Sequence, residues 1–368
     1  MPTYDTGVDR RPAVREEPRD VVDGLARVDG RLAAFFAERI AASATYGDDY
    51  QHLWSSARAA ADGGKRMRPR FVLATVAALG GAAESRAAVD TATAFELLHT
   101  AFLLHDDVID GDTVRRGRPN LSGEFAAEAS AQGADGARAR LWGESASILA
   151  GDLLLHAATA LVGRLDVPTA ARERLLDILD HSVVVTAAGE LADVGLAVGL
   201  TTPSLPAVLG MTERKTAAYS VAGPIMAGAI LGGGDDRLLA VLAEYGRLVG
   251  IAFQLGDDLL GVYGDQRQTG KSVLGDLREG KKTTLIAFAR STDRWGEIEG
   301  GLGRPDLTLA EAAAIARTLE ECGARSFVER LLADQVDRAV AALDTPEVPA
   351  GLAAELTTIA RSCIGRLG

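Results

Sequence analysis

The chain has 368 residues, 47% of them hydrophobic, and its 39 basic and 51 acidic residues give a net charge of −12. This acidic balance argues against nucleic acid as a partner, and the polar residues 1–19 have no apolar core of the kind a signal peptide needs. Cys322 and Cys363 are the only cysteines and have neither disulfide-framework nor metal-ligand spacing, so we expect a reducing, cytoplasmic compartment.

Apolar residues recur at helical spacing through most of the chain, whereas alternation typical of strands is scarce. We therefore expect an all-α fold, with a disordered tail over residues 1–20 and one helical domain over residues 21–368.

Residues 120–144, rich in Gly, Ala, Ser and acidic residues, are expected to form a long loop. The longest apolar run, residues 221–231, is too short and too glycine-rich to cross a bilayer, so we expect no transmembrane segment. Expected helices cover residues 21–44, 50–61, 85–111, 148–161, parts of 165–199 and 212–230, then 238–263, with two or three more at the end.

A basic segment, residues 65–69, opens a further expected helix between the helices at 50–61 and 85–111. Gly63 and Gly64 end the preceding helix, and Lys65 and Arg68 follow, with Pro69 in the first turn of the next one. Basic side chains at this end oppose the helix dipole, but they and the helix amides can bind an anion together. The alternative is a solvated basic turn.

The next expected helix delivers three acidic side chains, Asp106, Asp107 and Asp110, which we call the first aspartate cluster. Asp106 and Asp110 are four residues apart and so lie on the same helix face. Paired carboxylates repel each other unless a cation lies between them, and Mg²⁺ favours hard oxygen ligands of this kind. Arg115 and Arg116 follow as phosphate partners. The alternative is an acidic helix end in water beside a basic loop.

Two basic side chains lie within apolar helical patterns. His99 precedes Asp106 by two helical turns on the same face, although a lone histidine there is more often a core residue. Lys215 lies in an apolar run and needs a partner, which is either an anionic ligand or a surface carboxylate.

A second aspartate cluster, Asp257 and Asp258, ends another apolar helix one turn after Gln254. Lys271 and Lys281 follow it. Two such clusters facing each other could hold Mg²⁺ between them, and the duplicated pattern is a stronger signal than either copy.

In this order the motifs resemble those of the trans-isoprenyl diphosphate (polyprenyl) synthases, and the similarity spans residues 21 to the C-terminus. The resemblance implies a homodimer whose subunit is one helical bundle around a deep apolar cavity, with both aspartate clusters at the cavity mouth. It implies Mg²⁺-dependent head-to-tail condensation of an allylic diphosphate with isopentenyl diphosphate. The motifs that carry it are Gly63-Gly64-Lys65-Arg66-Met67-Arg68-Pro69, Asp106-Asp107-Val108-Ile109-Asp110, Arg115-Arg116-Gly117, Gly151-Asp152, Lys215-Thr216-Ala217, Phe253-Gln254, Asp257-Asp258-Leu259-Leu260-Gly261 and Gly280-Lys281.

The resemblance also implies a role for each matching residue. About three Mg²⁺ ions would neutralise the departing diphosphate, with Asp106, Asp110 and Asp257 as ligands and Asp107 and Asp258 beside them. The residues implied to bind the departing diphosphate of the allylic substrate are Arg115, Lys215, Lys271 and Lys281, and those implied to bind isopentenyl diphosphate are Lys65, Arg68, His99 and Arg116. Thr216 and Gln254 are also implied to bind substrate, and Lys215 and Gln254 belong with the aspartates to the implied catalytic set.

The resemblance also links product length to the size of the side chains about one turn before the first aspartate cluster. Phe102 is bulky and its neighbour Ala101 is small, which predicts a short product, geranylgeranyl diphosphate first and farnesyl diphosphate second. Two residues depart from the family pattern: Gly261 stands where many relatives have a third Asp, and Glu190 where most have Gln.

Two other functions fit part of the pattern. A class I terpene cyclase also ionises a prenyl diphosphate at an aspartate cluster, but it has no use for Lys65, Arg68 and Arg116. A non-catalytic partner subunit of another synthase would not need intact aspartates in both clusters.

Overall fold

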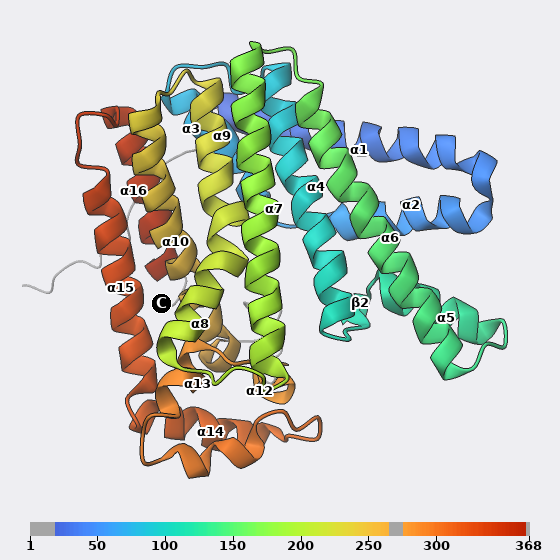
Figure 1. Ribbon diagram of the computed structural model, residues 1–368, viewed down its shortest axis with the longest axis vertical. Helices are drawn as coiled ribbons and strands as arrows, with labels where there is room; N and C mark the ends of the chain where they lie inside the picture. Colours follow the sequence, from blue (N-terminus) through green and yellow to red (C-terminus); the bar gives the residue numbers. More distant parts are fainter. Residues whose placement is uncertain (1–18, 265–274, 366–368) are drawn as a thin grey trace, which may run out of the picture.

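The computed structural model describes residues 19–264 and 275–365, so most of the expected tail, and Lys271, lie outside the described ranges. The described chain is helical almost throughout (Figure 1), which confirms the expected all-α fold. The exception is a two-stranded antiparallel ribbon, β1 (Val114–Arg115) and β2 (Arg118–Pro119).

The first helices are α1 (Arg19–Ser43), α2 (Asp48–Ala61), α3 (Met67–Ala78), α4 (Arg86–Ile109), α5 (Leu121–Ala131), α6 (Gly136–Gly163), α7 (Thr169–Ala197) and α8 (Leu205–Thr212). They are followed by the π-helix η2 (Glu213–Ala222), α9 (Gly223–Leu231), α10 (Asp236–Tyr263), α12 (Gly275–Glu279), α13 (Thr284–Ala289), α14 (Leu309–Glu321), α15 (Ala324–Ala342) and α16 (Ala350–Gly365). Short 3₁₀ turns are η1 (Ala44–Tyr46), η3 (Trp295–Glu297) and η4 (Glu299–Gly301).

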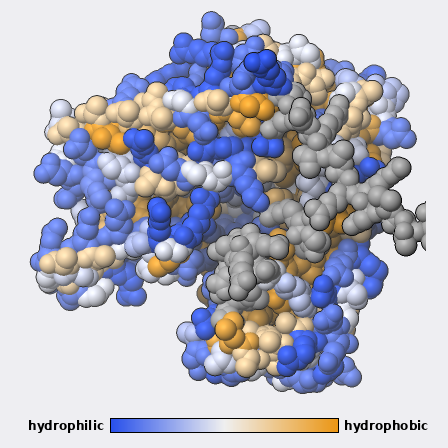
Figure 2. All heavy atoms as spheres, turned by 180° about the vertical axis from the view of Figure 1, so that it is seen from behind, coloured by the Kyte–Doolittle hydropathy of each residue, from blue (hydrophilic) through white to orange (hydrophobic). Residues whose placement is uncertain are grey.

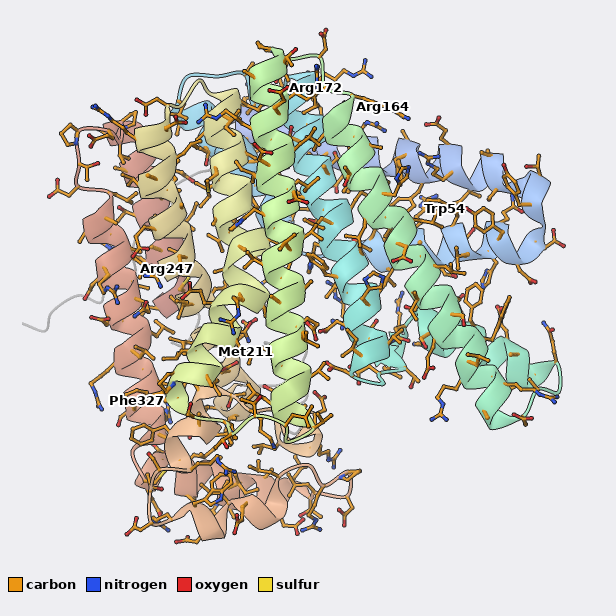
Figure 3. The ribbon with its side chains drawn as sticks, in the orientation of Figure 1. Trp54, Arg164, Arg172, Met211, Arg247 and Phe327 are labelled. Carbon is orange, nitrogen blue, oxygen red and sulfur yellow. The ribbon has the colours of Figure 1, made fainter. Side chains whose placement is uncertain are left out.

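Long helices form the body of the molecule. In Figure 1, α4, α7, α9, α10 and α15 run side by side, α1 and α2 extend as a hairpin to one side, and α14 crosses one end. The core lies between the long helices, where Phe95, Leu154 and Tyr245 are fully buried. The π-helix is fastened to this body by Arg247 of α10 (Figure 3), which pairs with Glu213 at 3.2 Å.

The expected loop over residues 120–144 is wrong. This stretch forms α5 and the beginning of α6, and each helix has an N-cap side chain. The Asn120 side chain accepts a hydrogen bond from Gly123 N at 2.8 Å, and Asp135 accepts one from Arg138 N at 2.9 Å. The stretch has little apolar periodicity, so its helix formation depends on alanine content and on these caps.

Hydropathy averaged over 18-residue windows shows longer apolar stretches than the single run at residues 221–231. Three described helices are long and apolar enough to cross a membrane by length and composition alone: α4, α6 and α10. In this fold 78% of the apolar window of α4 and 61% of that of α10 are buried, against 44% for α6. Helices α4 and α10 therefore use their apolar surfaces mainly against other helices, whereas much of the surface of α6 is exposed.

Glycines allow η2 to lie close between two helices. A Cβ on Gly189 of α7 would stand 2.2 Å from Lys215 N, and one on Gly250 of α10 would stand 2.4 Å from the Ala217 side chain. Larger residues would force the helices apart. Stretches of π-helix are rare and occur often at functional sites, and this one carries the predicted residues Lys215 and Thr216.

Candidate active site

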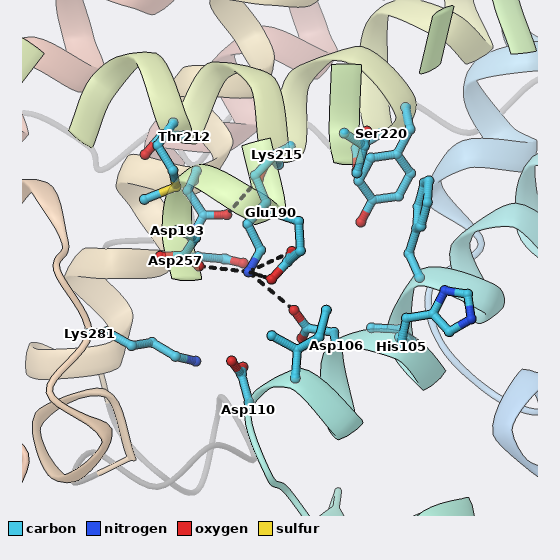
Figure 4. A pocket seen from close by; sticks show the side chains of 18 of the residues that line it. His105, Asp106, Asp110, Glu190, Asp193, Thr212, Lys215, Ser220, Asp257 and Lys281 are labelled. Atoms are coloured by element: carbon cyan, nitrogen blue, oxygen red, sulfur yellow. Dashed lines mark hydrogen bonds and ion pairs between the residues drawn. The ribbon is translucent and has the colours of Figure 1, made fainter. Parts of the chain in front are cut away.

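A cavity of about 740 Å³ brings the two aspartate clusters together. Its walls come from α4, α7, η2, α10 and the segment after α12, and Figure 4 shows side chains from these elements converging on one space. The face seen in Figure 2 has hydrophilic side chains interspersed with apolar ones. Charged residues that line the cavity include Asp106, Asp110, Glu190, Asp193, Lys215, Asp257, Asp258 and Lys281.

The first aspartate cluster divides between the cavity and the protein interior. Asp106 and Asp110 line the cavity, as their four-residue spacing predicts. Asp107 is 2% exposed and accepts a hydrogen bond from Arg115 Nε at 2.8 Å. Burial, reinforced by the charge of Asp106, raises the pKa of Asp110 to about 6. This carboxyl therefore lies in an environment where a nearby cation would stabilise its charged form.

Lys215 connects this cluster to α7. Its Nζ lies 3.1 Å from Asp106 Oδ1, 2.9 Å from Glu190 Oε2 and 2.7 Å from Asp193 Oδ2. Burial alone would lower the pKa of Lys215, but the three carboxylates raise it above its usual range. The partner that Lys215 required is thus a set of protein carboxylates, two of them on α7.

Glu190 and Asp193 were not among the predicted site residues. The signal available in the sequence was their spacing of three residues, which places both on one helix face. No local pattern joins them to Lys215, because η2 meets α7 only in the folded chain.

The second cluster divides in the same way. Asp257 lines the cavity, and Asp258 is 6% exposed. Gln254 Nε2 donates to Asp258 Oδ1 at 3.0 Å, and Thr216 Oγ1 donates to Gln254 Oε1 at 3.1 Å. Burial raises the pKa of Asp258 to about 7. Asp258 therefore anchors Gln254 and Thr216, while Asp257 lies on the wall that a ligand in the cavity would meet.

Lys281 closes the acidic side of the cavity opposite Asp110 (Figure 4). Its Nζ lies 2.9 Å from Glu279 Oε2 and 3.7 Å from Asp276 Oδ1. Burial would lower its pKa, but the charges of Asp276, Glu279 and Asp110 raise it.

The donor set on this side of the cavity fits Mg²⁺. Asp106, Asp110 and Asp257 offer carboxylate oxygens, and the Lys215 ammonium already lies 3.1 Å from Asp106 Oδ1. Within the described residues, only His52, Glu124 and Glu128 bring three ligand atoms within 4.8 Å of one another, and they do not line this cavity. The two aspartate clusters therefore do not close a protein-only cage. Such separation suits Mg²⁺, which usually takes one or two carboxylates and completes its shell with water and substrate phosphate.

A basic subsite lies on another wall of the same cavity. Arg68 Nη2 donates to Ser220 Oγ at 2.7 Å, and its guanidinium lies 4.8 Å from the Tyr219 ring centre. Among the described residues, Arg68 Nε and His99 Nδ1 are buried without a hydrogen-bond partner. Burial, followed by the charges of Arg68, Arg115 and Arg116, lowers the pKa of His99 well below its usual value. Buried polar nitrogens without partners beside several arginines indicate a site for an anion.

Arg116 extends this subsite toward the Gly63-Gly64 turn. Its guanidinium nitrogens lie 3.5 Å from the positions that Cβ atoms on Gly63 and Gly64 would occupy. Its backbone has a φ of 53° and that of Arg66 a φ of 48°, in the left-handed region that non-glycine residues rarely adopt. Such strain tends to occur at functional sites. Lys65, also predicted to bind isopentenyl diphosphate, is exposed and does not line the cavity.

The two residues predicted to set product length lie in different environments. Phe102 lines the cavity and packs edge-on against Tyr219, with ring centres 4.9 Å apart. Ala101 is fully buried in the core and does not line the cavity. Of the two residues, only Phe102 can therefore meet a ligand in the cavity.

Fold and site together define an all-α protein whose cavity has an acidic subsite beside a basic one. The polyprenyl synthetase family model matches residues 51–299. Geranylgeranyl diphosphate synthase of Methanosarcina mazei is 31% identical over 80% of this chain and 84% of its own length. The (2E,6E)-farnesyl diphosphate synthase of Mycobacterium tuberculosis is 31% identical over 82% of this chain and 80% of its own length. The geranylgeranyl pyrophosphate synthase of Corynebacterium glutamicum, solved with isoprenyl diphosphate and magnesium, superposes with a TM-score of 0.85 at 31% identity, covering 94% of this chain and 99% of that one.

The chain belongs to the polyprenyl synthetase family and is a prenyltransferase. The resemblance inferred from the motifs is thereby confirmed.

Proposed function

We propose that the chain condenses isopentenyl diphosphate with an allylic diphosphate, head to tail, to give a short-chain trans-prenyl diphosphate. One observation carries this proposal: the cavity has an acidic subsite with Asp106, Asp110 and Asp257 and a separate basic subsite with Arg68 and His99. A reaction between two diphosphates needs two such subsites, whereas a cyclase needs one. The named relatives, geranylgeranyl and farnesyl diphosphate synthases, support a short product.

Asp106, Asp110 and Asp257 are the residues that would hold Mg²⁺, with about three ions per site. When bound, Mg²⁺ supplies positive charge that stabilises the departing diphosphate. Lys215 and Lys281 add fixed positive charge around the same group. Asp107 accepts a hydrogen bond from the Arg115 guanidinium and so fixes its position. Arg115 is thereby preorganised to stabilise the charge of the same diphosphate.

The bond changes follow from this arrangement. The C–O bond of the allylic diphosphate breaks and leaves an allylic cation, which the double bond of isopentenyl diphosphate attacks to form a C–C bond. The adjacent carbon then loses a proton, and the released diphosphate is a base within reach. Arg68, His99 and Arg116 hold the second diphosphate so that the double bond faces the cation. His99 serves as a neutral hydrogen-bonding group, because its surroundings lower its pKa.

A homodimer is also proposed, and α6 supports it. The exposed apolar residues Leu141, Trp142, Ile148 and Leu149 form what we call the α6 face. Leu141 and Ile148 are seven residues apart, as are Trp142 and Leu149, so all four lie along one side of the helix. Contiguous apolar surface of this kind is typical of protein interfaces.

The test is incubation of the purified chain with radiolabelled isopentenyl diphosphate, Mg²⁺ and dimethylallyl, geranyl or farnesyl diphosphate in turn. We expect label in a prenyl diphosphate product, geranylgeranyl as the main species and farnesyl next. No incorporation with any primer would reject the synthase. Cyclic hydrocarbon formed from the primer alone would favour the terpene cyclase.

A further inference from the structure

The two aspartate clusters differ at one position. In the first, Asp106 and Asp110 place carboxylates four residues apart on the same face of α4. In the second, Asp257 has Gly261 at the equivalent position on α10. The second cluster therefore lacks the carboxylate that its own helix would supply.

Asp276 of α12 fills this place from a different part of the chain. A Cβ added to Gly261 would stand 2.1 Å from Asp276 Oδ2 and 3.0 Å from its Cγ. The Asp276 carboxylate thus lies where a side chain at position 261 would begin. A close approach of this kind is possible only because residue 261 is glycine.

Two contacts with Lys281 hold Asp276 in this position. Lys281 N donates to Asp276 O at 2.9 Å, and Lys281 Nζ lies 3.7 Å from Asp276 Oδ1.

We propose that Asp276 supplies the missing carboxylate of the second aspartate cluster and acts as a positioning residue for the cation held at Asp257, and that Gly261 exists to admit it. This inference rests on the proposed function, because it presumes that Asp257 serves a Mg²⁺–diphosphate site. Asp276 adds negative charge beside Asp257 and orients Lys281, whose ammonium lies on the diphosphate side of the cavity.

The experiment measures the affinity of the full chain for Mg²⁺ in the presence of inorganic diphosphate, by isothermal titration calorimetry. Asp276→Asn keeps the shape of the side chain and should weaken Mg²⁺ affinity by about 10-fold or more, the usual effect of losing an outer carboxylate partner. Gly261→Ala should have a similar effect, because its Cβ displaces the Asp276 carboxylate.

Gly256→Ala on the same helix is the matched control, since its Cβ would meet nothing closer than 3.6 Å. The double variant Gly261→Asp with Asp276→Gly moves the carboxylate back onto α10 and should regain most of the affinity that Asp276→Gly alone loses. Circular dichroism of each variant shows that it is folded.

Unchanged Mg²⁺ affinity in Asp276→Asn would overturn the proposal. A double variant no better than Asp276→Gly would also overturn it, because Asp276 would then act only in packing α12. Wild-type chain that binds no Mg²⁺ with diphosphate would contradict the proposed function itself, and this result is seen before any variant is compared.

Discussion

Within each aspartate pair, neighbouring residues have different roles. Asp106 and Asp257 line the cavity, whereas Asp107 and Asp258 are buried and hold Arg115 and Gln254. The four-residue spacing predicted the shared face of Asp106 and Asp110. It could not predict the Arg115 contact, because Arg115 reaches Asp107 from the ribbon strand β1 of the folded chain. Gln254 and Asp258 are themselves four residues apart on α10, so their contact follows the same rule as the shared face of Asp106 and Asp110.

The Asp258 carboxyl predicts how the stability of the ligand-free protein changes with pH. Its pKa is raised from 3.8 to about 7 in the fold. Between these values the folded state keeps a proton that the unfolded state has released, so the free energy of unfolding decreases as pH rises through this window. An asparagine side chain at this position would not titrate. We therefore expect the melting temperature of Asp258→Asn, relative to wild type, to be higher at about pH 8 than at about pH 4.5 in EDTA. A difference that does not change with pH would contradict the raised pKa.

Arg116→Ala tests the assignment of the two diphosphates. Arg116 lies against the Gly63-Gly64 turn on the basic side of the cavity. Its loss should raise the KM for isopentenyl diphosphate by about 10-fold, as expected for a charged hydrogen bond, and change the KM for the allylic substrate less. Steady-state kinetics with each substrate varied in turn measures both. Equal increases would mean that the two subsites are assigned the wrong way round.

At the level of elements, helices with regular apolar spacing could be predicted and the others could not. Helix α4 was predicted close to its bounds because its apolar residues recur at every turn. Helix α5 was missed because its stretch has small and polar residues and only the caps mark it. The π-helix η2 was not predicted either, since its geometry depends on the close glycine contacts with α7 and α10.

Helix α4 also predicts how product length is set. Phe102 lies one turn before Asp106 on α4 and packs edge-on against Tyr219, and we propose that these two rings form the floor of the cavity. Phe102→Ala should open this floor and lengthen the main product by about one isoprene unit or more, since removal of the ring frees space for the growing prenyl chain. Chromatography of dephosphorylated products measures the length.

Folding of this variant must be checked alongside. Phe102 is only partly buried, so the loss of stability should be below the roughly 3–5 kcal/mol of a fully buried Phe→Ala change. A folded variant with an unchanged product distribution would show that Phe102 is ordinary packing.

For the whole molecule, the all-α architecture could be predicted from helical periodicity, and the function from two motifs in order. The sequence does not predict that α4, α7, η2 and α10 converge on one cavity, because contacts between distant segments leave no local periodic signal. The exposed surface was also not predictable: residues 148–161 have the pattern of an ordinary apolar helix, and only the fold shows that Leu141, Trp142, Ile148 and Leu149 of α6 remain exposed.

The α6 face predicts the oligomeric state. Leu149 is 56% exposed in the subunit, and Leu149→Glu would bury a charge in the proposed interface at high cost. We expect wild type to be a dimer and this variant a monomer by size-exclusion chromatography with light scattering. Leu309→Glu, at a 70% exposed leucine on α14, is the matched control and should stay dimeric. A wild-type monomer, or a dimeric Leu149→Glu, would contradict the assignment.

The most direct test of the central claim, that both aspartate clusters serve one reaction, is the turnover of Asp106→Ala and Asp257→Ala with saturating Mg²⁺, isopentenyl diphosphate and primer. Each change removes a carboxylate from a different wall of the same cavity. If the ions they hold stabilise one departing diphosphate, each variant alone should lose turnover by about 10²-fold or more. Near-normal turnover in either folded variant would contradict the claim.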